Sequence, residues 1–152
     1  TPEARRLVAE VIRAWRPRFL FVHYWDDAHP DHVAACRLSE AARFYAKLTR
    51  TTMRGEPHYP ARIFYFLSNH FRLHLKPAFI LDVTPFWERK MAACRAYHSQ
   101  FFKGRPPEEG EAFFARLEIL GRYWGQLIGV RYGEPFFCRE EIGLRGIGDL
   151  VG

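Results

Sequence analysis

The first fifteen residues of the chain have the apolar pattern of an amphipathic helix. Thr1 and Pro2 are typical of an N-cap and a first helical position, and Pro17 ends the run. Apolar side chains recur between them at helical spacing, at Leu7, Val8, Val11, Ile12 and Trp15. Arginines and glutamates interrupt these positions, as a signal peptide would not allow. The pattern therefore predicts a helix over residues 1–15.

The next segment, residues 18–25, has the pattern of a strand. Its apolar centre, residues 19–22, is unbroken, which is typical of a strand buried on both faces of a parallel sheet. A loop with two aspartates then leads to Pro30. Beyond it, apolar positions follow at helical spacing, at Ala34, Leu38, Ala41, Tyr45 and Leu48. We predict a strand, a loop and a second helix with this apolar face.

The remainder of the chain continues the alternation of strands and helices. Residues 62–68 and 79–83 predict two more strands, and glycine and prolines between 49 and 61 predict a loop. A helix is expected from Thr84, with its apolar face at Trp87, Met91, Cys94 and Phe101. A last long helix carries Phe113, Leu117, Leu120 and Trp124, with Gly129 as its cap. This order predicts an α/β fold with a mainly parallel sheet, in one domain over residues 1–152.

Composition narrows the class of protein further. The chain has 152 residues, of which 48% are hydrophobic and 16% aromatic, so it can build a core and is not a disordered tail. No apolar run approaches the roughly 20 residues that cross a bilayer, so we expect no membrane partner. The three cysteines form no CxxC pair, which favours a reducing, cytoplasmic location.

The formal net charge of +6 raises the question of nucleic acid. The arginines are scattered along the chain, and two of them are adjacent only at Arg5 and Arg6. We therefore expect no nucleic-acid partner and attribute the excess charge to a solvated surface or an anionic small substrate. A basic nucleic-acid-binding domain remains the weaker alternative.

The candidate chemistry lies in the sequence His29-Pro30-Asp31-His32, directly after the first predicted strand. In α/β sheets ligands gather at the carboxyl ends of strands. Histidines three apart at the start of a helix can point the same way, and imidazole and carboxylate are ligands that zinc prefers. Two histidines do not complete a catalytic zinc site, and polar residues also cap helices. Metal, catalytic and capping roles all remain open on spacing alone.

These residues carry a family resemblance. The stretch RPRFLFVHYWDDAHPDHVAACRLSEAARFYAKL resembles the second signature of the LmbE-like (PIG-L) zinc deacetylases. It is most similar to the bacillithiol-pathway enzymes that deacetylate N-acetylglucosaminyl malate, and the resemblance continues through KPAFILDVTPFWERKMAACRAYHSQF and GVRYGEPFF. It implies a Rossmann-like three-layer sandwich, a Zn²⁺ cofactor, an amino-sugar substrate and a homo-oligomer, for example a hexamer.

The resemblance also implies a role for each residue of the motif. His32 would be a zinc ligand. His29, as imidazolium, would stabilise the oxyanion and then protonate the leaving amine, and Asp31 would hydrogen-bond His29. These roles match what amide hydrolysis needs, namely an activated water, charge stabilisation and an acid for the leaving group.

The chain departs from the family in two places. The family's first signature, Ala-His-Pro-Asp-Asp, supplies two more zinc ligands and the general base, and this sequence does not contain it. We therefore expect the chain to be the C-terminal two-thirds of a deacetylase, truncated at its N-terminus and inactive alone. Ala28 stands where many bacillithiol-branch members have arginine. Arg72, with His70 or His74, is the candidate that binds the malate carboxylates, although this segment also fits a solvated loop.

Two further interpretations concern the whole chain and a single histidine. A non-catalytic α/β module that kept the fold and lost the chemistry is the alternative to a deacetylase. A scaffold has no use for His29, Asp31 and His32 together, so the sequence favours the enzyme.

His23, inside the first strand, is expected to be a packed core histidine.

Overall fold

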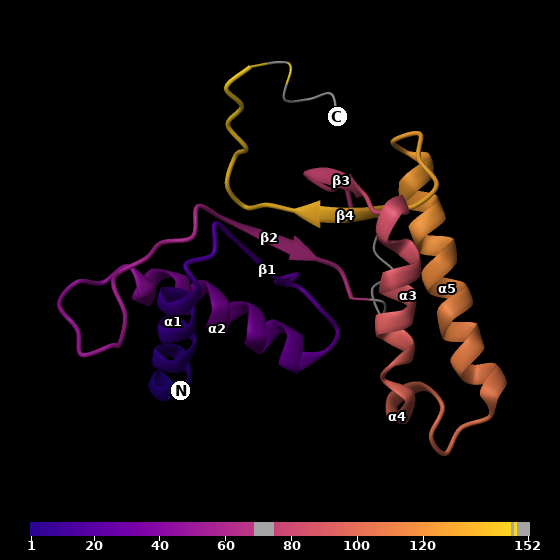
Figure 1. Cartoon of the computed structure of the whole chain (residues 1–152), viewed down its shortest axis with the longest axis horizontal. Helices are drawn as coiled ribbons and strands as arrows, with labels where there is room; N and C mark the ends of the chain where they lie inside the picture. The colour runs from indigo at the N-terminus through magenta and orange to yellow at the C-terminus, as the bar shows by residue number, and fades with distance from the viewer. Residues whose placement is uncertain (69–74, 147, 149–152) are drawn as a thin grey trace. The chain divides into compact units, whose positions relative to one another are not determined.

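The computed structural model describes residues 1–68, 75–146 and 148 of the chain. It comprises two compact units, residues 1–75 with 137–152 and residues 76–136. The alternation of helices and strands confirms the predicted α/β class. In chain order the elements are α1 (Pro2–Trp15), β1 (Phe19–His23), α2 (Pro30–Ala46), β2 (Arg62–Phe66), β3 (Phe79–Asp82), η1 (Thr84–Phe86), α3 (Trp87–Arg95), α4 (His98–Phe101), α5 (Pro107–Gln126) and β4 (Gly133–Phe137) (Figure 1).

In the first unit, α1 packs against α2. The Thr1 hydroxyl accepts a hydrogen bond from the Ala4 N–H at 3.2 Å, so α1 begins where the sequence predicts. The two helices meet through small side chains, because Ala9, Ala42 and Ala46 are completely buried between them. Leu20 of β1 packs against the same cluster. One face of the strand is therefore covered by helices.

The predicted apolar face of the second helix is only partly correct. The buried positions of α2 are Cys36, Ala42, Arg43 and Ala46, whereas Ala34 is exposed. Ala42 and Ala46 are buried in place of the predicted Ala41 and Tyr45, so the face is displaced by one position. It also includes an arginine, which a pattern of hydrophobic residues does not count and whose charge is satisfied by backbone carbonyls and a carboxylate.

Strands β1 and β2 pair in parallel, from Phe19 opposite Arg62 to His23 opposite Phe66. Their helix-facing residues are buried in one core cluster that includes Val22, Ile63, Tyr65 and Cys36. On the other face, Phe19 and Phe21 are exposed and contact Phe64 at ring distances of 5.5 and 5.7 Å. The prediction that residues 19–22 are buried on both faces is therefore wrong, because the helices α1 and α2 of this unit cover one face only.

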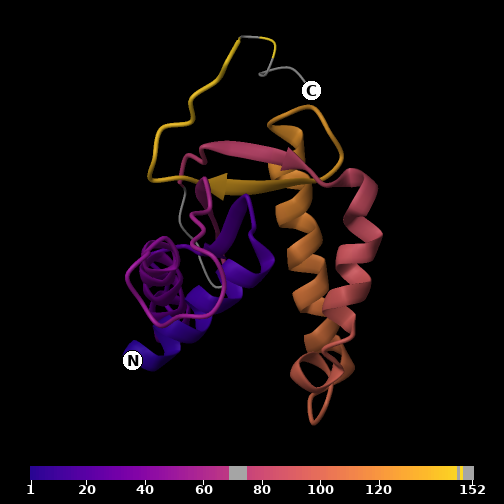
Figure 2. The same cartoon turned by 60° about the vertical axis from the view of Figure 1, so that its left-hand side comes forward.

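In the second unit, β3 and β4 pair antiparallel, from Phe79 opposite Phe136 to Asp82 opposite Gly133. Helices α3 and α5 run side by side (Figure 2). The Trp87 ring stacks on Tyr132 at 4.1 Å and lies against Gly121, where a Cβ atom would come within 2.5 Å of the indole. Trp87 thus requires a glycine in α5.

Two features of this unit differ from the sequence predictions. Strand β4 was not expected, because Gly133 and Pro135 are poor strand formers. The single helix expected from Thr84 through Phe101 is divided into η1, α3 and α4, and the break falls at Tyr97, whose ψ of 51° is not helical.

Candidate active site at the start of helix α2

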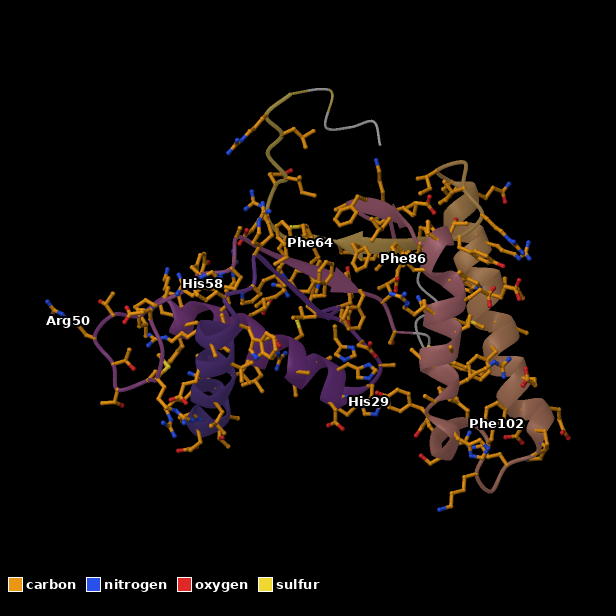
Figure 3. All side chains as sticks on the ribbon, in the orientation of Figure 1. His29, Arg50, His58, Phe64, Phe86 and Phe102 are labelled. Carbon is orange, nitrogen blue, oxygen red and sulfur yellow. The ribbon has the colours of Figure 1, made fainter. Side chains whose placement is uncertain are left out.

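The motif of the sequence analysis lies where the chain passes from β1 into α2. His29 is the N-cap of α2, with an extended backbone, and its Nδ1 accepts a hydrogen bond from the Asp31 N–H at 3.2 Å. Pro30 occupies the first helical position, where its missing N–H costs nothing. Figure 3 labels His29 at this end of the helix. The predicted site residues His29, Asp31 and His32 are thus brought together just beyond the carboxyl end of β1.

A buried carboxylate that the sequence analysis did not single out joins the two histidines. The Asp27 side chain is 0% exposed. Its Oδ1 accepts the backbone N–H of His29 at 2.8 Å, and its Oδ2 lies 3.0 Å from Nδ1 of His32. Burial by itself would raise the pKa of Asp27, but hydrogen bonds from the His29 backbone, the Ser68 side chain and His32 outweigh it and hold that pKa below its ordinary value. Asp27 is therefore ionised at neutral pH.

The three histidine rings of this region stack on one another. The His32 ring lies 4.1 Å from His23 with an angle of 8° between planes, and 4.6 Å from His29 with an angle of 19°. His23 is half-buried and also packs against Phe66, so the histidine that we predicted to be packed is at the same time a neighbour of the site. Burial, followed by the nearby His32 and His29, lowers the pKa of His23, so it is neutral at neutral pH.

Asp31 is placed differently from Asp27. Its side chain is 89% exposed, and its carboxylate lies 4.0 Å from Nδ1 of His29. The hydrogen bond to His29 comes from the Asp31 backbone rather than from its carboxylate. The other predicted binding residues, Arg72, His70 and His74, lie outside the described residues.

The chemistry of the donor set fits one ligand of a zinc ion. Metal-ligating histidines usually donate their second ring N–H to a carboxylate, and His32 has this arrangement with Asp27. Among residues 1–68, 75–146 and 148, no group of three or more His, Cys, Asp or Glu side chains could hold a metal ion. In the same part of the chain, no helix is long and apolar enough to cross a membrane.

Sequence reasoning missed Asp27 and His23 for related reasons. Asp27 lies in a polar loop, where an aspartate is usually solvated, and only the fold shows that it is buried. His23 sits among aromatic residues, which suggested a core position. The one available signal was its place at the last position of β1, the strand end where we expected the chemistry.

The chain is similar to several known proteins, although no family model matches it. It is 28% identical over 142 residues to the diacetylchitobiose deacetylase of Thermococcus kodakarensis, a match that covers 88% of this chain and 49% of that protein. The crystal structure of the conserved protein TT1542 from Thermus thermophilus is 35% identical, with a TM-score of 0.80, covering 95% of this chain and 61% of that one.

Two further solved structures share the fold. The N,N'-diacetylchitobiose deacetylase of Pyrococcus horikoshii, in complex with its inhibitor, is 26% identical with a TM-score of 0.70, covering 90% of this chain and 51% of that one. GalB, the 4-carboxy-2-hydroxymuconate hydratase of Pseudomonas putida, is 19% identical with a TM-score of 0.76, covering 97% of this chain and 62% of that one.

These likenesses establish the fold, which is common to a deacetylase and a hydratase and therefore does not decide the reaction. The chain spans about half the length of the curated relative that it matches. The function has to be argued from the site itself.

Proposed function

We propose that this chain is part of an LmbE-like deacetylase that hydrolyses the N-acetyl group of an N-acetylglucosamine conjugate. One observation carries the proposal: His29 and His32 are held on a common buried carboxylate at the start of α2, in a chain similar to two diacetylchitobiose deacetylases. The resemblance of the segment around the motif to the second signature of that family adds support.

In this proposal His32 is a ligand of Zn²⁺, as its contact with Asp27 favours. When bound, Zn²⁺ would supply an activated water and polarise the amide carbonyl. His29 lies beside His32 and acts on the amide substrate. Its imidazolium donates a hydrogen bond to the oxyanion and then transfers a proton to the leaving amine.

Asp31 supports His29 only when His29 is protonated. Neutral His29 uses Nδ1 to accept the Asp31 N–H, and protonation of Nδ1 ends that bond. The Asp31 carboxylate, 4.0 Å away, is then the group that pairs with the new charge. The exposure of Asp31 thus agrees with a role in the steps at which His29 is protonated, before the proton passes to the leaving amine.

The described residues supply one ligand and no general base. The resemblance assigns both other ligands and the base to the sequence Ala-His-Pro-Asp-Asp, which this chain does not contain. We propose that residues 1–152 alone are inactive, and that activity requires the sequence that carries this signature. A cytoplasmic location and a homo-oligomer such as a hexamer belong to the same proposal.

The aglycone of the substrate, the group attached to N-acetylglucosamine, separates two versions of the proposal. The names of the two deacetylase relatives point to diacetylchitobiose, whereas the motif is most similar to enzymes acting on N-acetylglucosaminyl malate. Both compounds contain N-acetylglucosamine. Arg72 is the proposed carboxylate-binding residue in the malate version. Acetate release from the two compounds distinguishes the versions when a protein that carries the first signature is compared with its Arg72→Gln variant, because only the malate reaction should weaken.

The roles of the two histidines are tested in a protein that includes the first signature. His32→Ala should lose both zinc and activity. His29→Ala should keep its zinc and lose about 10²–10⁴ in kcat, and Asp31→Asn should also keep its zinc. The measurements are zinc content by elemental analysis and steady-state acetate release. Zinc lost from His29→Ala but kept in His32→Ala would invert the assignment, and unchanged kinetics in all three variants would exclude the deacetylase.

A further inference from the structure

The site contains two aspartates close to the histidines, and they differ completely in their surroundings. Asp31 stands in the recognised motif and is exposed, whereas Asp27 lies outside it and is buried. We propose that Asp27, rather than Asp31, is the positioning residue of the site, which fixes the ring protonation of His32 and the backbone position of His29.

The hydrogen bonds of Asp27 use both of its oxygens. Oδ1 accepts from the His29 N–H at 2.8 Å, and Oδ2 lies 3.0 Å from Nδ1 of His32. An ionised carboxylate can only accept hydrogen bonds, so the His32 nitrogen that faces it must carry the proton. Asparagine, which is nearly the same size, has a single acceptor oxygen and could satisfy only one of the two donors.

The same reasoning assigns the proton of neutral His29 to the opposite ring nitrogen. The Asp31 backbone N–H is a donor, so Nδ1 of His29 must accept and the proton resides on Nε2. In His32 the proton resides on Nδ1, and Nε2 carries the lone pair. Imidazole ligates metal through a nitrogen lone pair, and a donor N–H is what a carbonyl oxygen needs. The two histidines are thus set up for different tasks.

Asp27 is the group that maintains this difference. It binds the proton of His32 directly, and its bond to the His29 N–H joins the N-cap of α2 to the same carboxylate. Removal of the carboxylate removes the acceptor that faces Nδ1 of His32. Part of the population would then carry the proton on Nε2, where it blocks ligation through that nitrogen.

The first test needs neither metal nor substrate. Ring ¹⁵N chemical shifts of the metal-free wild type, recorded at a pH where the histidines are neutral, report which nitrogen carries each proton. We expect Nδ1–H for His32 and Nε2–H for His29. Nε2–H for His32 in the wild type would overturn the inference, whether or not any variant folds.

The second test compares Asp27→Asn with Asp31→Asn in the protein that carries the complete signature set, and it alone rests on the proposed function. Asp27→Asn should show mixed protonation of His32 and a zinc affinity about 10–100-fold weaker, as for other partners of metal ligands. Asp31→Asn should keep the wild-type tautomers and zinc affinity. Far-ultraviolet circular dichroism establishes that both variants are folded.

The outcomes separate the inference from the proposed function. Equal zinc affinities for the two variants, or weaker binding only in Asp31→Asn, would contradict the role of Asp27. A wild type with the expected tautomers that binds no zinc and releases no acetate would instead contradict the deacetylase, and leave Asp27 as the residue that sets the histidine protonation.

Discussion

Charged side chains are buried at both ends of helix α2, but the groups that they contact differ in their chemistry. At its amino end, Asp27 contacts the backbone of His29 and the ring of His32, and an imidazole ring can both donate and accept a proton. At its carboxyl end, the buried groups are Arg13 and Arg43, which stay charged at every pH the protein meets. A buried charge therefore does not by itself mark a site. What distinguishes the amino end is that its partners can exchange protons.

The carboxyl end shows what a purely structural network looks like. The Arg13 guanidinium donates to the carbonyl oxygens of Ala46 at 3.0 Å, Met53 at 3.2 Å and Gly55 at 2.9 Å, and also to that of Leu48. Through these bonds one side chain of α1 fixes the loop that follows α2. Gly55 has a φ of 81°, and a Cβ there would lie 3.0 Å from that of Arg13, so the loop requires glycine at this point.

The largest effect on stability is expected at Arg13. Arg13→Met fills similar space but leaves the carbonyls of Leu48, Met53 and Gly55 without this donor, at about 1–3 kcal/mol for each unsatisfied group. The Ala46 carbonyl keeps the His58 N–H. We expect the free energy of unfolding, measured in urea, to fall by at least about 3 kcal/mol. Arg16→Gln is the matched control, because exposed Arg16 makes a single 3.4 Å bond to the Pro57 carbonyl. It should change stability by less than about 0.5 kcal/mol. Equal losses of unfolding free energy in Arg13→Met and Arg16→Gln would contradict the structural role of the Arg13 hydrogen bonds.

These contacts also explain how much the sequence could predict. Helix α1, strands β1 to β3 and helix α5 follow from apolar spacing, caps and prolines, and the motif at His29 follows from its place after β1. Spacing could not reveal Asp27, because its burial depends on how the loop folds back on α2. Arg13 and Arg43 were counted as surface charge for the same reason. Asp27, Arg13 and Arg43 are each buried by contacts with residues that no regular sequence spacing connects to them.

A smaller effect separates structure from chemistry at the amino end. His29→Ala removes the side-chain cap of α2 and should cost up to about 1 kcal/mol of stability. His29→Asn also removes the imidazole but restores a good capping residue, so its stability should stay close to wild type. Thermal unfolding of the two variants measures the difference. If both lose the same amount, the cap contributes nothing and the imidazole itself stabilises this end of the helix.

The carboxyl end of α2 should show a modest dependence on acid. Hydrogen bonds from Arg43 at 2.7 Å and Arg62 at 2.8 Å hold the pKa of Glu140 below its ordinary value of 4.5. A carboxylate whose pKa is lower in the folded state stabilises the fold above the ordinary pKa, and that contribution is lost as the pH falls through the lowered value. Stability measured from pH 6 to pH 3 should therefore decline less steeply in Glu140→Gln than in wild type. Parallel curves would show that these ion pairs contribute nothing to stability, as is common for half-exposed ion pairs.

The smallest effect is expected at Cys36, which lies on α2 between the two ends. Burial, and then the charge of Glu40, raise the pKa of Cys36 to about 11. At pH 8 only about one thiol in a thousand is then ionised. The thiolate is the reactive form, and the side chain is completely buried, so a disulfide reagent should modify the half-buried Cys94 and Cys138 well before Cys36. Mass spectrometry of the partly labelled protein gives the order. Early labelling of Cys36 would mean that α2 opens locally in its middle, and the two ends could then not be treated as parts of one rigid helix.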